Sequence, residues 1–274
     1  MASVFDRQDP AVARYYDRAP EEDRLKYGAA LLEEARTREL IQRHAPGPPA
    51  IVLDVGGGAG AYSFWLADLG YSVHLVDAAP RLIAEAQRRA APGQLASSRV
   101  GDARALEFPD AHADLVLLLG PLYHLTEAAD RARALAEARR VMKPGGWFFG
   151  AVISRWASAL DGLSRDLFQD ARFAAIVQRD LQDGQHRNPT DRLDYFTTAY
   201  FHRPADALRE TAAAGFANPR IFGIEGPGWL LADVAERMSD PRRRADLLSV
   251  ARMVENEPSL SGASAHLLVV AQKP

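Results

Sequence analysis

The feature that most constrains the fold is a glycine-rich turn between an apolar run and an amphipathic segment. Residues 51–55, Ile-Val-Leu-Asp-Val, form an almost continuous apolar run, as expected of a strand buried on both faces. Gly56, Gly58 and Gly60 follow, and helical spacing begins at Ala61. Glycine tolerates positive φ and lets a ligand approach the backbone. The segment therefore predicts a strand, a tight turn and a helix beside a binding site.

The same alternation continues along most of the chain. Further strands are expected at residues 72–76, 98–100, 114–119, 147–153, 219–224 and 265–271, and helices at residues 61–69, 81–90, 126–142 and 204–215. Two helices precede the first strand, one beginning at Pro10 and one running from Glu21 towards His44. Repeated alternation favours an α/β fold with a doubly wound, mostly parallel sheet and right-handed crossovers.

Composition excludes several classes of protein. Hydrophobic residues make up 47% of the 274 residues and charged residues 25%, which is the balance of a globular protein with a large core. The formal net charge of −3 gives no overall basic field and disfavours a nucleic acid partner. No cysteine is present, which excludes disulfides and a cysteine nucleophile. No secretory signal or membrane-crossing run is found, so we expect a cytoplasmic protein without a membrane partner.

The glycine turn by itself leaves two kinds of ligand open. Gly56 and Gly58, with Ala61 in the third position, fit a variant of the dinucleotide fingerprint, and Asp77 lies where the ribose partner of NAD would be. Asp54 argues against a dinucleotide, because a carboxylate at the strand end gains nothing beside a diphosphate. It suits the cationic amino acid tail of S-adenosylmethionine, directly or through water.

Asp54 is the first of three acidic residues at three successive strand ends. Asp77, at the end of the second strand, could accept hydrogen bonds from both ribose hydroxyls. Asp102, after the third strand, could accept one from the adenine amino group. Together the three favour S-adenosylmethionine over a dinucleotide.

Four segments make residues 9–153 resemble the class I S-adenosylmethionine-dependent methyltransferases. They are Leu-Asp-Val-Gly-Gly-Gly-Ala-Gly at 53–60, Val-Asp-Ala at 76–78, Gly-Asp-Ala at 101–103 and Met-Lys-Pro-Gly-Gly at 142–146. The resemblance implies a seven-stranded sheet in the order 3-2-1-4-5-7-6, with strand seven antiparallel and the cofactor across strands one to four. The cofactor contacts it implies are Tyr15, Tyr16, Asp54, Gly56, Gly58, Gly60, Asp77, Asp102, Ala103 and Leu119.

The same resemblance divides the chain into two parts. Residues 1–45 are expected to form N-terminal helices that cover the cofactor site, with one tyrosine of the Tyr15-Tyr16 pair over the methionine end. Residues 46–274 are expected to form the methyltransferase domain, with insertions at 154–203 and 226–262.

The segment Gly-Pro-Leu-Tyr-His at 120–124, after the fourth strand, should face the sulfonium. Amino-directed nucleic-acid methyltransferases carry an Asp or Asn here, whose oxygen accepts from the target amino group, and Gly120 has no such oxygen. His124 is the candidate general base, since imidazole takes a proton near neutral pH. Tyr123 is a candidate wall beside the methyl group. A structural histidine and a packed aromatic ring are the alternative interpretations.

The two insertions are rich in side chains that could line a small-molecule pocket. The candidate substrate contacts are Arg155, Trp156, His186, Tyr195, Tyr200 and Trp229, with Asn188, His202 and Glu225 beside them in the sequence pattern. No spacing of histidine and acidic residues indicates a metal site. We expect a monomer or homodimer that methylates an oxygen or nitrogen of a small molecule, in bacterial specialised metabolism. An NAD(P)-dependent oxidoreductase and a non-catalytic S-adenosylmethionine-binding module are the alternatives.

Overall fold

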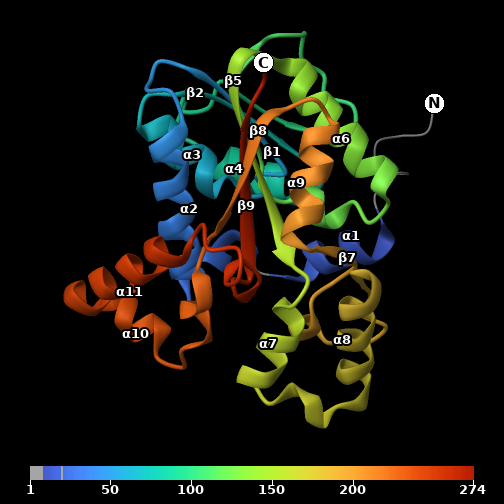
Figure 1. The fold of residues 1–274 in the computed structure, drawn as a ribbon. Coiled ribbons are helices and arrows are strands. Elements are labelled where there is room, and N and C mark those ends of the chain that lie inside the picture. The colour runs from blue at the N-terminus through green and yellow to red at the C-terminus, as the bar shows by residue number, and fades with distance from the viewer. Residues whose placement is uncertain (1–8, 20) are drawn as a thin grey trace.

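The computed structural model describes residues 9–19 and 21–274, which form a twisted central sheet with helices on both faces (Figure 1). The main sheet has the order β3-β2-β1-β4-β5-β9-β8. Its strands are β1 (Ile51–Val55), β2 (Ser72–Asp77), β3 (Ser97–Val100), β4 (Ala113–Leu118), β5 (Met142–Ser154), β8 (Ala217–Gly223) and β9 (His266–Gln272). The first five are parallel, and β9 is antiparallel to both β5 and β8. With β8 and β9 as strands six and seven, the predicted order is confirmed.

Helices cover each face of the sheet because the strands are apolar on both sides. One face carries α2 (Ala30–His44), α3 (Ala61–Asp68) and α4 (Pro80–Arg89), and the other carries α6 (Ala128–Val141) and α9 (Pro204–Ala213). Leu40 and Leu66 pack with Val52 on the first face, while Leu135 packs with Leu53 on the second. Successive residues of β1 thus enter different cores.

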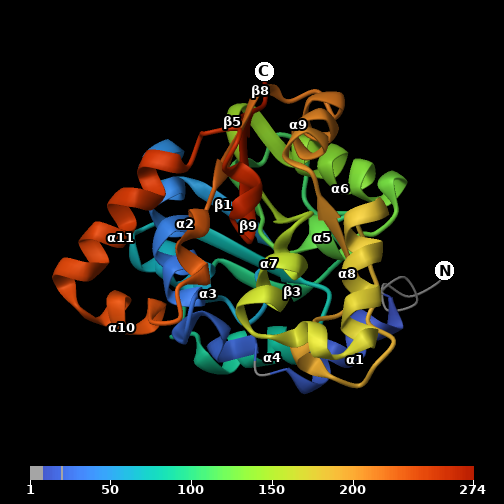
Figure 2. The same cartoon turned by 60° about the horizontal axis from the view of Figure 1, so that its bottom comes forward.

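The insertion after β5 forms a small lobe at the carboxyl end of that strand (Figures 1 and 2). It contains α7 (Ala157–Ser164), η3 (Leu167–Gln169), α8 (Ala171–Asp183), β6 (Gln185–His186), η4 (Leu193–Tyr195) and β7 (Ala199–His202). β7 extends the sheet, pairing in parallel with the last residues of β5. β6 pairs antiparallel with β7. The sequence reading missed both strands, which are two and four residues long.

The second insertion packs on the N-terminal part of the chain. It contains η5 (Gly226–Leu230), α10 (Val234–Ser239), α11 (Pro241–Val254) and η6 (Ser261–Ala263). Val234, Met238 and Leu247 bury Leu32 of α2 in a separate apolar cluster. In Figure 1, α10 and α11 accordingly lie on the α2 side, away from α7 and α8.

Two boundaries differ from the prediction. The single helix expected from residue 21 to residue 44 is wrong: η2 (Glu21–Lys26) and α2 are separated at Gly28, whose φ of +59° breaks the helix. β5 begins at Met142, before the Pro-Gly-Gly turn expected to precede it, because Met142 already pairs with Ala113 of β4. By contrast, α1 (Pro10–Arg18) begins as predicted, capped by Asp9, whose Oδ1 accepts from the Ala11 N–H at 2.7 Å.

None of the helices in the described part of the chain is long and apolar enough to span a membrane.

Candidate active site

A cavity of about 520 Å³, called here the cofactor cavity, lies over the carboxyl ends of β1, β2, β3 and β4. Parallel strands bring their carboxyl ends to one edge, so residues far apart in sequence meet there. Its lining includes Gly56, Gly57, Gly58, Asp77, Asp102, Ala103, Leu119, Tyr123 and His124. Tyr16 of α1 and Arg24 of η2 also line it. The edge of the sheet predicted to bind the cofactor therefore holds a cavity.

The glycine turn is shaped by two close approaches. Gly56 has a φ of +74°, and a Cβ placed on it would lie 2.4 Å from the Pro121 side chain. Gly120 is confined less severely, since its Cβ would lie 3.1 Å from the Gly56 carbonyl oxygen. Gly58 lines the cavity, whereas Gly60, at the start of α3, does not. Gly60 shapes the turn, and the structure does not place it among the residues around the cavity.

Asp77 holds the glycine turn and also lines the cavity. Its Oδ2 accepts from the Gly58 N–H at 2.8 Å, and its Oδ1 accepts from the Ala79 N–H at 2.8 Å. Burial raises the pKa of this carboxyl, although both backbone donors oppose the rise. A carboxylate has about four lone-pair positions, so each oxygen can accept one further hydrogen bond from a ligand.

Asp102 is held by Arg104, a residue that the sequence reading did not single out. The Asp102 carboxylate accepts from the Arg104 N–H at 2.8 Å and pairs with its guanidinium at 2.7 Å. Arg104 also bonds to Asp130 of α6 at 2.8 Å. These ion pairs hold Asp102 at the cavity wall, which is where its position after the third strand predicted it. Arg104 lies between Asp102 and α6.

Asp54 lies behind the glycine turn and does not line the cavity. Its side chain is fully buried, and its Oδ2 accepts from the Ser63 hydroxyl of α3 at 2.7 Å. Its Oδ1 has no hydrogen-bond partner among the described residues. Burial raises the pKa of Asp54 to about 6, and the nearby Asp77 adds to the rise. The structure therefore does not bring Asp54 to the cavity surface, where direct contact with a ligand was expected.

Tyr16 and His124 form a hydrogen-bonded pair at the cavity. The Tyr16 hydroxyl lies 2.7 Å from His124 Nε2, and His124 Nδ1 lies 3.3 Å from the Thr198 carbonyl oxygen. A carbonyl oxygen accepts and does not donate, so Nδ1 carries the hydrogen and Nε2 accepts from Tyr16. Desolvation lowers the pKa of His124 to about 4. At neutral pH the imidazole is therefore neutral and its lone pair faces Tyr16.

Helix α1 is fastened at both ends, which positions Tyr16. At its carboxyl end, the Arg81 guanidinium of α4 donates to the Tyr16 carbonyl at 2.6 Å and to the Ala19 carbonyl at 3.1 Å. At its amino end, the Thr197 hydroxyl donates to the Ala11 carbonyl at 3.1 Å. The helix thus bridges α4 and the lobe after β5.

A second cavity of about 270 Å³, called here the acceptor cavity, lies between the sheet end and this lobe. Tyr16, Arg24 and Tyr123 line both cavities. Tyr15 lines the acceptor cavity alone and meets the Tyr16 ring edge-on, with centroids 5.3 Å apart. Of the tyrosine pair, the structure therefore brings Tyr16 to the cofactor cavity and Tyr15 to its neighbour.

Phe196 is the centre of the aromatic wall between the cavities, and the sequence reading missed it. Its ring centroid lies within 5.4 to 6.5 Å of those of Tyr15, Tyr123, His124 and His186. Its φ of +63° lies in the left-handed region, which is unusual for a bulky residue and concentrates at functional sites. No pattern in the sequence around Phe196 indicates this conformation, and its ring contacts with Tyr15 and Tyr123 come from residues far away in the sequence.

The predicted substrate contacts divide into two groups. His186, Tyr195 and Trp229 line the acceptor cavity. Arg155, Trp156 and Tyr200 line neither cavity. The last three have structural contacts instead: Arg155 donates to the Phe201 carbonyl at 2.8 Å, Trp156 covers Gly262, and the Tyr200 ring lies under the Arg131 guanidinium.

The other three residues noted in the insertions also have structural partners. Asn188 donates to the Phe196 carbonyl at 2.7 Å, His202 is bonded to Glu210, and Glu225 binds His266 and Ser264. None of the three lines either cavity.

Glu33, Glu225 and His266 place three possible metal-ligand atoms within 4.8 Å of one another. Both oxygens of Glu33 already accept from the Arg24 guanidinium, at 2.7 and 3.0 Å. Glu225 accepts from His266 Nδ1 at 2.6 Å and from the Ser264 hydroxyl at 2.7 Å. The two cationic side chains neutralise both carboxylates, so the cluster is built as an ion-pair network.

Residues 53–150 match the family described as "Methyltransferase domain". A ubiquinone/menaquinone biosynthesis C-methyltransferase of Acidiphilium cryptum is 34% identical over 148 residues, covering 51% of this chain and 55% of that protein. A ubiquinone biosynthesis O-methyltransferase of Methylocella silvestris is 35% identical over 116 residues, covering 41% of this chain and 44% of that protein. The chain spans about half the length of these two curated relatives.

Among solved structures, an S-adenosylmethionine-dependent methyltransferase from Mesorhizobium loti superposes with a TM-score of 0.60 at 19% identity. The superposition covers 88% of this chain and 100% of that one. At this level of identity the likeness shows a common fold.

Proposed function

This chain belongs to the class I S-adenosylmethionine-dependent methyltransferase family, and on that basis we propose that it methylates a small molecule held in the acceptor cavity. The family predicted from the four sequence motifs is confirmed, with S-adenosylmethionine as its methyl donor. The relatives do not favour the NAD(P)-dependent alternative. One observation carries the proposal: Tyr16, whose hydroxyl is hydrogen-bonded to His124, lines both cavities.

The residues around the cofactor cavity fit S-adenosylmethionine. Asp77 has an accepting position left on each oxygen, which suits two ribose hydroxyls. Asp102 and Ala103 would lie beside the adenine, and the backbone of Gly56 and Gly58 would lie against the methionine portion, where no side chain intervenes. When bound, this molecule supplies an electrophilic methyl group on a sulfonium sulfur, which keeps the electron pair of the broken bond.

The protein's part in the reaction is to align the acceptor and to remove its proton. Alignment of two reactants can lower a barrier by about 7 to 11 kcal/mol in favourable models. The aromatic wall of Tyr15, Tyr123 and Phe196 would confine the acceptor so that its nucleophilic atom faces the shared wall.

A hydrogen-bonded relay can take the proton. The acceptor's O–H or N–H proton passes to the Tyr16 hydroxyl oxygen while the Tyr16 hydrogen passes to His124 Nε2, 2.7 Å away. The low pKa of His124 makes it a weak base. A weak base suffices because the acceptor becomes strongly acidic as its new bond to carbon forms. The Nδ1 hydrogen bond to Thr198 holds the ring in the tautomer that this step requires.

The relatives support a small-molecule acceptor and point to quinone biosynthesis rather than to specialised metabolism. The relay requires an acceptor that carries a removable proton, such as a phenol, a hydroquinone or an amine. We therefore propose methylation of an oxygen or nitrogen. The O-methyltransferase relative supports oxygen, whereas the C-methyltransferase relative is named for transfer to carbon.

Two measurements test the proposal. S-adenosylhomocysteine should raise the melting temperature of the protein, and NAD should not. With radiolabelled S-adenosylmethionine, turnover should be found within a panel of phenols, hydroquinones and primary amines. Binding of S-adenosylhomocysteine without transfer to any of them would favour a non-catalytic module.

Tyr16→Phe tests the relay itself. The variant keeps the ring but removes the hydroxyl bonded to His124, so kcat should fall by about 10²-fold or more, the usual contribution of proton transfer, while the Kd for S-adenosylhomocysteine changes little. In the unaltered protein, kcat should fall as the pH drops through about 4, because protonated His124 accepts no further proton. A Tyr16→Phe enzyme with wild-type kcat would remove the relay from the mechanism.

A further inference from the structure

The acceptor cavity presents mostly carbon surface, because its polar side chains are already bonded to protein. The Trp229 indole N–H donates to the Ala263 carbonyl at 2.8 Å, and the Tyr195 hydroxyl donates to Asp170 at 3.0 Å. His186 uses both ring nitrogens, on Asp180 and on the Tyr195 carbonyl, each at 2.9 Å. These rings therefore offer their faces and edges to a ligand, and a flat apolar body fits a cavity walled in this way.

His266 differs from the other polar side chains that line this cavity. Its Nδ1 lies 2.6 Å from Glu225 Oε1 and 3.8 Å from Glu33 Oε2. Its Nε2 has no partner among the described residues. Two carboxylates on one side of the ring keep it in the imidazolium form, and they raise its pKa to about 9 against the opposing effect of desolvation. An imidazolium donates from both nitrogens, so Nε2 is left with a hydrogen to donate.

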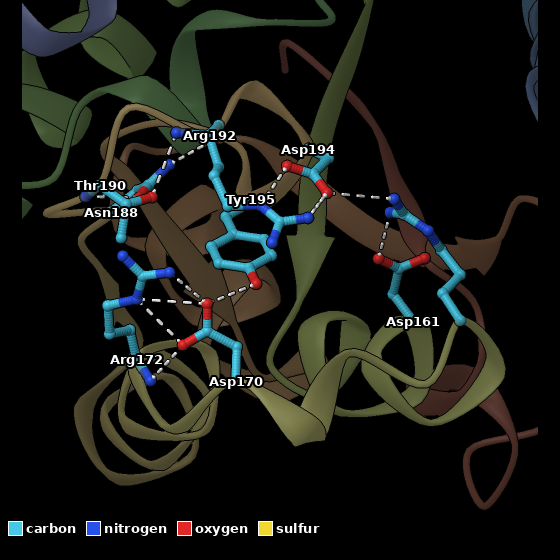
Figure 3. Close-up of polar contacts among 9 residues, drawn as sticks. Asp161, Asp170, Arg172, Asn188, Thr190, Arg192, Asp194 and Tyr195 are labelled. Atoms are coloured by element: carbon cyan, nitrogen blue, oxygen red, sulfur yellow. Dashed lines mark hydrogen bonds and ion pairs between the residues drawn. The ribbon is translucent and has the colours of Figure 1, made fainter.

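The carboxylates of the acceptor cavity lie in the lobe after β5 and are paired with arginines (Figure 3). Arg165, which follows α7, bonds to Asp161 at 2.9 Å and lies 3.8 Å from Asp194. Asp194 is also bonded by Arg192 at 2.8 Å. Each aspartate thus faces a guanidinium, which lowers its attraction for a cationic ligand.

We propose that the acceptor is a planar, largely apolar molecule with a carboxylate, phenolate or carbonyl oxygen that accepts a hydrogen bond from His266. This inference rests on the proposed function, and it adds the chemical class of the acceptor. His266 is a specificity residue in this scheme: it holds one oxygen of the acceptor, while Tyr16 and His124 act at the atom that receives the methyl group. Arg24, paired with Glu33, lines both cavities beside this end of the acceptor cavity.

A matched series of naphthalene derivatives tests the inference directly. 2-Naphthoate, 2-naphthol and 2-naphthylmethylammonium share one flat body and differ in the polar group. Their Kd values are measured by quenching of tryptophan fluorescence in the presence of saturating S-adenosylhomocysteine. A charge-assisted hydrogen bond predicts that 2-naphthoate binds about tenfold or more tightly than the ammonium compound. Failure of all three to bind, or equal binding of the first and third, would overturn the inference.

The pH dependence adds a test that requires no variant. The charged groups facing His266 are Glu33 of α2, Glu225 beside η5 and Arg24 of η2. Raising the pH through about 9 removes the imidazolium proton, so the affinity for 2-naphthoate should fall about tenfold. An affinity that stays constant through this range would exclude His266 as the donor.

Two variants locate the donor. His266→Gln keeps an uncharged N–H donor and should lose part of the preference for 2-naphthoate. His266→Leu combined with Glu225→Gln removes the donor without leaving Glu225 charged and unpaired, and it should reduce the preference to within about threefold. Persistence of the full preference in the double variant would overturn the assignment, and a preference for the ammonium compound would indicate Asp161 and Asp194 instead.

The failure of this inference and of the proposed function are distinguishable. An unaltered protein that binds S-adenosylhomocysteine and transfers methyl groups, without any preference for an acceptor oxygen, refutes the role of His266 alone. A protein that does not bind S-adenosylhomocysteine refutes the proposed function. The affinity of each variant for S-adenosylhomocysteine also shows whether that variant is folded. If a variant does not fold, the pH titration of the unaltered protein still tests whether His266 is the donor.

Discussion

Asp54 should destabilise the unliganded protein at neutral pH, although it lies at the centre of the cofactor-binding segment. Its carboxylate is fully buried, with one oxygen on Ser63 and the other without a partner among the described residues. Burial raises its pKa from the ordinary 3.8 to about 6. Since each pH unit corresponds to about 1.4 kcal/mol, ionising Asp54 in the folded protein costs about 3 kcal/mol more than in the unfolded chain.

The sign of the pH dependence follows from that difference. Between pH 3.8 and about 6 the folded state retains a proton that the unfolded state has released. The contribution of Asp54 to the free energy of unfolding therefore falls as the pH rises through this window, and the full cost is present above it.

Asp54→Asn removes the titration. The amide oxygen can still accept from Ser63, but the amide N–H₂ would lie where the unpartnered oxygen is, at a cost of about 1 kcal/mol or more. Relative to the unaltered protein, we expect the variant to gain about 2 kcal/mol in free energy of unfolding above the window and to lose about 1 kcal/mol below it, where the Asp54 carboxyl is itself uncharged. Urea unfolding of the cofactor-free variant and of the unaltered protein, at pH values below, within and above the window, measures these differences.

The decisive measurement is how the difference in free energy of unfolding between Asp54→Asn and the unaltered protein changes with pH. Asp246→Asn, on the exposed surface of α11, is the matched control and should show a small, nearly constant difference. A stability difference between Asp54→Asn and the unaltered protein that does not change with pH would refute the reasoning.

Two further predictions concern the shape of the cofactor cavity. Gly56→Ala should abolish detectable binding of S-adenosylhomocysteine in calorimetry, because its Cβ would lie 2.4 Å from the Pro121 side chain. Gly93→Ala is its control, since Gly93 has a similar φ of +77° in open space; it should cost about 1 kcal/mol of stability and leave binding unchanged. Arg81→Met should raise the Kd for S-adenosylhomocysteine by about tenfold, because it releases the Tyr16 end of α1; an unchanged Kd would show that α1 docks without it.

The sheet was predictable because its determinants are local. β1, β2 and β4 are short and mostly apolar, whereas β3 is Ser-Ser-Arg-Val, and each of the four strands ends at a turn or cap residue that the sequence displays. The strand order came from the family resemblance, and the pairing of β9 between β5 and β8 confirms it. β6 and β7 were missed because two and four residues carry too little periodicity to be recognised.

The candidate site was predictable in part. Asp77, Asp102 and Tyr16 reach the cofactor cavity because strand ends and the docked α1 place them there. The insertion residues were chosen by residue type, and type does not say which way a side chain points. Arg155 and Tyr200 accordingly lie outside both cavities.

The sequence alone thus determined the strand, turn and helix around the glycines and the residue types at each strand end, since backbone preference and hydrophobic period act over a few residues. Tertiary structure decided which groups meet. It joined the Tyr16 hydroxyl to His124 across 108 positions, and it set His266 against two distant glutamates. Such contacts depend on how helices and insertions dock on the sheet, and docking depends on packing among elements that no local pattern records.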